Sequence, residues 1–133
     1  MKNRCSLLFI FVVCILAIGQ SLNAQESKAG KPKQFIYILR LVPRLYSDSA
    51  WTNEDSAVLK RHFVRFQEAA KSGQLILAGR TSGSGDQAFG IAVFEAADEE
   101  AARKFMQEDP AVVGGLMTAE LHPFAVALQR KNP

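Results

Sequence analysis

The chain has 133 residues, 48% of them hydrophobic, and carries 16 Lys and Arg against 13 Asp and Glu. This length and composition allow one ordinary domain and exclude an extended disordered or collagen-like chain. Because no basic stripe with interleaved aromatic residues accompanies the small net charge, nucleic acid is not an expected partner.

The first 24 residues have the pattern of an export signal peptide. A basic start precedes thirteen uncharged, mostly apolar residues, Leu7 to Gly19, and a polar stretch that ends in Ala24. Thirteen helical residues cover about 20 Å, less than the roughly 30 Å hydrocarbon core of a bilayer, so an uncleaved membrane span is the less favoured alternative. We therefore expect an exported protein, periplasmic or secreted. Both cysteines, Cys5 and Cys14, would leave with the signal, which excludes disulfides and thiolate metal sites.

The rest of the chain divides into a flexible polar leader, residues 25–33, one domain, residues 34–128, and a tail, residues 129–133. Thr52 followed by Asp55 resembles the capping box of a helix start, and Gly73 suits the end of that helix. Runs of β-formers and apolar residues at helical spacing define the other elements. The predicted elements are a strand at 35–42, a helix at 54–72, strands at 75–81 and 88–96, a helix at 98–107, a turn at 111–115 and a strand at 117–128.

This βαββαβ order predicts an α+β domain of the ferredoxin-like kind, a four-stranded antiparallel sheet with both helices on one face. In the second and third strands both alternating sets of side chains are largely apolar. Because two helices cover only one face of the sheet, the other face predicts a homodimer that packs sheet on sheet. A monomer whose outer face is covered by loops or the tail is the alternative.

A histidine lies among the apolar positions of the first predicted helix. His62 falls within a stripe that is expected to face the core and consists of Val58, Leu59, Phe63, Phe66, Ala69 and Ala70. A buried imidazole can act as a general base or acid when another group orients its ring, and Asp109 is a candidate for that role. Asp109 also precedes Pro110, as a helix cap does. The alternative is a core histidine bonded to a backbone carbonyl and an aspartate that only caps.

Three segments together resemble the YciI-like (YCII-related) family: RHFVRFQEAAKSGQLILAGR, GIAVFEA and EDPAVVGGLMTAELHPF. The resemblance covers about residues 34–128. It implies a dimeric α+β barrel and an active site formed by His62 and Asp109. Some members act as dehydrochlorinase-like or lactone-handling enzymes on small ring compounds, which implies a small-molecule ligand here.

Other polar residues of the predicted strands are candidates for binding a carboxylate-bearing substrate. Arg80 lies beside Gly79, where a ligand can come close to the backbone, and Arg40 and Tyr37 lie on the first strand. The alternative for each arginine is a solvated or ion-paired side chain at a sheet end. Two distant histidines without cysteine do not form a zinc site, and the glycines fit no phosphate loop, so no metal or cofactor is expected. If a haem group were bound, it would need an axial ligand, and His62 is the residue that could supply it.

The sequence thus predicts an exported small-molecule enzyme that uses His62 and Asp109 for proton transfer, of an elimination or isomerisation type. The alternative is a non-catalytic module with the same fold and the same homodimer, binding a small ligand or serving a structural role. In that case the two side chains only satisfy each other's hydrogen bonds.

Overall fold

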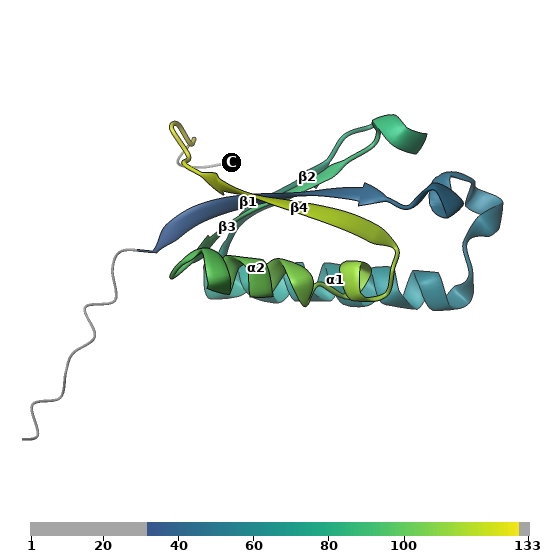
Figure 1. Ribbon diagram of the computed structural model, residues 1–133, viewed down its shortest axis with the longest axis horizontal. Helices are drawn as coiled ribbons and strands as arrows, with labels where there is room; N and C mark the ends of the chain where they lie inside the picture. The colour runs from purple at the N-terminus through teal and green to yellow at the C-terminus, as the bar shows by residue number, and fades with distance from the viewer. Residues whose placement is uncertain (1–31, 131–133) are drawn as a thin grey trace, which may run out of the picture.

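The computed structural model describes residues 32–130. The predicted signal peptide and the leader up to residue 31 lie outside the described residues, as do residues 131–133 of the predicted tail. The described chain forms an antiparallel sheet in the order β2-β3-β1-β4, with its helices on one face (Figure 1). The main elements are β1 (Lys33–Leu41), α1 (Asn53–Ser72), β2 (Leu75–Arg80), β3 (Gly90–Ala96), α2 (Glu99–Gln107), α3 (Pro110–Val113) and β4 (Met117–Phe124). This order and this sheet confirm the predicted ferredoxin-like α+β fold. None of the helices formed by residues 32–130 has the length and apolar character needed to cross a bilayer.

The start of α1 is fixed by the predicted capping box. The amide of Asp55 donates to Thr52 Oγ1 at 3.1 Å, and the amide of Thr52 donates to Asp55 Oδ2 at 3.0 Å. The guanidinium of Arg44, from the 3-10 helix Pro43–Tyr46, donates to both carboxylate oxygens of Asp55 at 2.8 and 2.9 Å. At the other end Gly73 takes the left-handed conformation with φ 83°. These contacts set where α1 begins, and hence where its middle residues lie against the sheet.

Most predicted boundaries are within two residues of the structure, with β1 beginning at Lys33 and β3 at Gly90, but two differ more. β4 ends at Phe124 rather than at residue 128, because Phe124 pairs with Gln34 and β1 extends only one residue further in that direction. Beyond it the amide of Val126 donates to the Gln34 side chain at 2.8 Å, outside the sheet. The predicted turn at 111–115 instead contains α3, a single turn of helix capped by Asp109.

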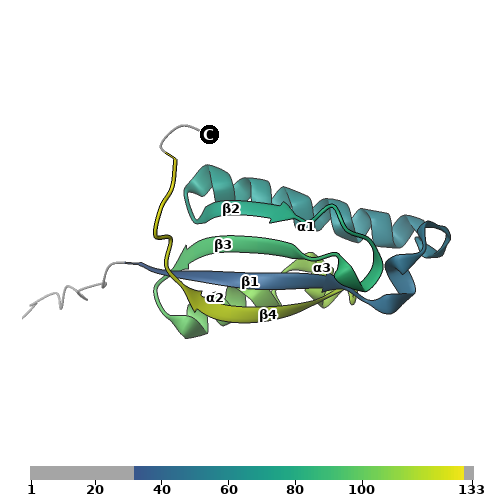
Figure 2. The same ribbon diagram turned by 90° about the horizontal axis from the view of Figure 1, so that it is seen from above.

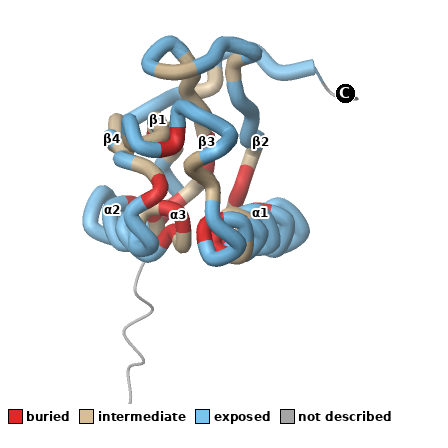
Figure 3. Tube along the Cα trace, turned by 90° about the vertical axis from the view of Figure 1, so that its right-hand side faces the viewer, coloured by how far each residue is buried: buried red, intermediate tan, exposed pale blue. Residues whose placement is uncertain are grey.

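The core lies between the sheet and the helices (Figure 3). α1 runs along the β2 side and α2 lies under the β4 side of the sheet (Figure 2). The buried side chains of the main cluster include Phe35, Tyr37, Leu39, Phe66, Ala69, Ala92, Phe94, Ala102 and Met106. The prediction for the α1 stripe is wrong at Phe63, which is 61% exposed, and at Ala70, which is also exposed. Each follows a buried residue by one position, and one residue turns the helix by about 100°.

The outer face of the sheet is only partly apolar. Side chains alternate along each strand, so the residues between the buried positions point away from the helices. Ile36, Ile38 and Ile91 are half-buried on this face, and Leu77 is 45% exposed. β4 adds polar side chains beside them, with Glu120 paired to Ile38 in the register. The outer face is therefore an apolar centre with a polar border at one edge.

Candidate functional site

The two residues predicted to form a site are in direct contact. His62 lies in the middle of α1, and Asp109 is the residue immediately before α3. The distance from His62 Nδ1 to Asp109 Oδ1 is 2.7 Å. His62 is 8% exposed and Asp109 is fully buried, so the contact is shielded from solvent.

Asp109 is held by three donors. Oδ1 also accepts the Ala111 amide at 2.9 Å, which makes this carboxylate the cap of α3, and Oδ2 accepts the Tyr37 hydroxyl at 2.8 Å. Burial alone would raise the pKa of Asp109, but the hydrogen bond and charge of His62, the Ala111 amide and the Tyr37 hydroxyl together lower it below its ordinary value. Asp109 is therefore an anion near neutral pH. His62 donates its Nδ1 proton to it, which leaves Nε2 as the free ring nitrogen.

Tyr37 lies behind the dyad rather than at a ligand surface. Its side chain is fully buried on the inner face of β1 and packs against Phe66 and Phe94. Burial, followed by the charge of Asp109 and the hydrogen bond to it, raises the pKa of Tyr37 well above its ordinary value. Tyr37 is thus a neutral, permanent donor to Asp109.

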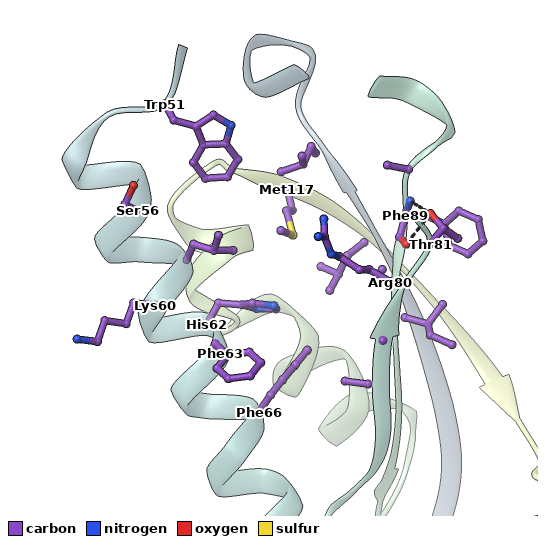
Figure 4. A pocket seen from close by; sticks show the side chains of 18 residues that line it. Trp51, Ser56, Lys60, His62, Phe63, Phe66, Arg80, Thr81, Phe89 and Met117 are labelled. Atoms are coloured by element: carbon purple, nitrogen blue, oxygen red, sulfur yellow. Dashed lines mark hydrogen bonds between the residues drawn. The ribbon is translucent and has the colours of Figure 1, made fainter. Parts of the chain in front are cut away.

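A cleft of about 740 Å³ opens between α1 and the ends of β2 and β3 (Figure 4). His62 extends from α1 into it, and the described residues supply no hydrogen-bond partner for Nε2. The walls are mostly apolar and include Leu39, Leu41, Trp51, Leu59, Phe63, Phe66, Ala78 and Met117. Trp51 is held in place by a hydrogen bond from Nε1 to the Leu45 carbonyl at 3.2 Å. The free face of His62 therefore meets an open cleft with mostly apolar walls that is large enough for a small molecule.

Two of the four predicted substrate-binding residues share this cleft with His62. Arg80 extends from β2 toward α1 (Figure 4), and Gly79 lines the cleft with its backbone. A Cβ added at Gly79 would meet no atom within 4 Å, and because Gly79 pairs with Ile91 it would point to the outer face of the sheet.

The other two do not reach the cleft. Tyr37 is buried behind His62, as described above. Arg40 is exposed on the outer face, where its guanidinium lies 5.3 Å from the centre of the Phe89 ring. Alternation along β1 is the reason, because Leu39 and Leu41 on either side of Arg40 take the positions that face the cleft.

Sequence reasoning missed two contributors. Phe63 was placed in the core stripe but lines the cleft, and its position one residue after His62 is the signal that could have shown this. The backbone amide of Ala111, which binds Asp109, gives no sequence signal of its own. Within residues 32–130, no three His, Cys, Asp or Glu side chains gather as a metal site would require.

Comparison with known proteins identifies the family. The model of the YCII-related domain matches residues 40–124. No curated protein sequence matches the chain. Among solved structures the chain is similar to a variant of SnoaB, a cofactor-independent oxygenase from Streptomyces nogalater, at 17% identity and a TM-score of 0.39, over 77% of this chain and 100% of that one. Because the family model matches well over half of the chain, the protein belongs to the YCII-related domain family.

Proposed function

We propose that this protein is an exported enzyme that moves a proton on a small organic molecule, with His62 as the base. One observation carries the proposal: Nδ1 of His62 is held at 2.7 Å by a buried, anionic carboxylate, while Nε2 opens into an apolar cleft. A base that is oriented on one side and free on the other is what general-base catalysis requires. A histidine needed only for packing would not have to present its second nitrogen to a cleft.

The arrangement supports a two-step path. Nε2 takes a proton from a carbon of the bound molecule, and the C–H electron pair forms a new double bond. In an elimination the leaving group departs with its own electron pair and His62 then gives the proton to it or to water, and in an isomerisation His62 returns the proton to a different atom. Asp109 stabilises the imidazolium that forms in between, while Tyr37 and the Ala111 amide keep the carboxylate in place.

The proposal is tested with 5-nitrobenzisoxazole, a flat aromatic probe that reports base strength in apolar sites. A base removes its ring proton, the electron pair forms a nitrile, the N–O bond breaks, and a coloured phenolate is released. The expected result is saturable catalysis that falls by about 10²–10⁴-fold in kcat/KM for His62→Gln. The matched control is His122→Gln, because His122 lies on β4 and faces Glu120 at 3.2 Å instead of the cleft.

Two outcomes would contradict the proposal. A folded His62→Gln variant with the wild-type rate would place the base elsewhere. A wild-type rate no higher than that of free imidazole at the same concentration would favour the non-catalytic module, in which His62 and Asp109 only satisfy each other.

We also propose a homodimer through the outer sheet face. The support is the apolar centre of that face, where Leu77 on β2 is 45% exposed and three isoleucines are only half-buried. Leu77→Asp should convert a dimer to a monomer in sedimentation velocity, because it places a charge in the buried patch. Val113→Asp is the control, since Val113 is 72% exposed on α3, among the helices rather than on the sheet. A monomeric wild type, or a Leu77→Asp variant that stays dimeric, would contradict this interface.

A further inference from the structure

Among the described residues, no carboxylate pairs with the Arg80 guanidinium. Among residues 32–130 its guanidinium has neither a hydrogen bond nor an ion-pair partner, whereas Arg44, Arg61 and Arg103 each contact a carboxylate. Figure 4 shows the Arg80 side chain extending from β2 into the cleft, in the direction of α1. The other basic residue at the cleft, Lys60, turns its amine away from it (Figure 4). Arg80 is therefore the cation that is aimed into the site.

The walls of the cleft are complementary to an organic anion. None of the described residues that line it is acidic, and the nearby carboxylate of Asp109 lies behind the ring of His62. Aromatic and aliphatic side chains line the cleft on both sides of His62, with Trp51 on one side and Phe63 and Phe66 on the other (Figure 4). Flat faces of this kind favour a planar, apolar molecular body. A guanidinium, in turn, presents two parallel N–H donors that match the two oxygens of a carboxylate.

We propose that the ligands of this cleft are small planar carboxylates, aromatic or unsaturated, with the carboxylate on Arg80 and the carbon skeleton beside Nε2 of His62. This inference rests on the proposed function, because it assigns the substrate class of the same cleft. Arg80 orients the molecule from β2, and His62 reaches it from α1.

Intrinsic fluorescence tests the inference directly, since Trp51 is the only tryptophan of the chain and lines the cleft. The probes are benzoate and benzamide, which share a shape but differ in charge. Benzoate should quench or shift Trp51 emission saturably, with a Kd at least about tenfold below that of benzamide. One hydrogen bond between charged groups can account for a tenfold difference in Kd. We expect the lower end of the range for such bonds, because Arg80 is exposed to solvent on one side.

Charge variants decide whether Arg80 is responsible. Arg80→Gln should bring the two Kd values within about twofold of each other, and Arg80→Lys should keep part of the preference. Arg103→Gln removes the same charge from α2, where Arg103 contacts Glu99, and should retain the full preference. Equal Kd values in the wild type, a preference that survives Arg80→Gln, or no saturable response to benzoate would each overturn the inference.

The test is independent of catalysis. His62→Gln should still bind benzoate with the wild-type preference, because the carboxylate is held by Arg80. Failure of the elimination assay with intact benzoate binding would refute the proposed function alone. Intact elimination with no preference for benzoate would refute the substrate class alone.

Discussion

The hydroxyl of Tyr37 can be removed without altering the packing around it, which makes it a sharp test of the buried network. It donates to Asp109 Oδ2 at 2.8 Å, and its ring centre lies 5.5 Å from that of Phe94 and 6.1 Å from that of Phe66. Tyr37→Phe keeps the ring and leaves Oδ2 without its donor. A hydrogen bond to a charged group contributes about 1.5–3 kcal/mol, so the free energy of unfolding should fall by about 2 kcal/mol. For a domain of this size that corresponds to a decrease in Tm of about 10 °C.

Urea unfolding followed by Trp51 fluorescence, with thermal unfolding by circular dichroism, measures both quantities. The matched control is Tyr46→Phe, because Tyr46 is 41% exposed and its hydroxyl has no hydrogen-bond partner among the described residues. We expect this control to change stability by less than about 0.5 kcal/mol. If Tyr37→Phe were as stable as Tyr46→Phe, the Tyr37 hydroxyl would not be bonded to a carboxylate anion, and the reasoning about the network would be refuted.

Three further predictions concern acid, alkali and packing. The pKa of Asp109 is lower in the folded chain than its ordinary value of about 3.9. The stability that the Asp109 carboxylate contributes is therefore complete above pH about 3.9 and is lost as the pH falls below this value. In urea titrations, Asp109→Asn should lack this part of the acid dependence. The pKa of Tyr37 is raised in the folded chain, so the stability that its hydroxyl contributes is constant below pH about 10 and decreases above it. In a variant where Tyr37 is the only tyrosine, tyrosinate absorbance should rise only with unfolding. A Cβ at Gly114 would lie 2.8 Å from Val58 Cγ1, so Gly114→Ala should reduce the free energy of unfolding by about 1–3 kcal/mol. The control is Gly79→Ala, whose added Cβ would have no atom within 4 Å and which should change stability by less than about 0.5 kcal/mol.

The fold was predictable because its signals are local. The Thr52 and Asp55 capping box, the stop at Gly73 and the alternation of helical and strand periods each define an element without knowledge of its neighbours. The length of β4 was not predictable in this way. Residues 125–128 resemble a strand in composition, but a strand needs a partner, and β1 extends only one residue beyond Gln34.

The site was predictable only in part, for a related reason. The His62 and Asp109 pair follows from one buried stripe, one cap and a family resemblance. Tyr37 and Arg40 lie three positions apart on one strand, so alternation alone places them on opposite faces of the sheet. Which face carries the helices could not be read from β1, because both of its faces are largely apolar. The contact between Tyr37 and Asp109 depends on the packing of the whole core.

The buried network also ties the site to the folding of the whole domain. Tyr37 and Asp109 are 72 positions apart, and His62 and Asp109 are 47 positions apart. Contacts at such separations close long loops, whose conformational entropy must be offset before the contacts become stable. A nascent or proteolytically nicked chain that lacks α3 would contain His62 and most of the cleft, yet its imidazole would have no anion to orient it. The activity we propose would therefore switch on only when the last part of the domain has docked, so the appearance of catalysis during refolding should coincide with the final folding phase.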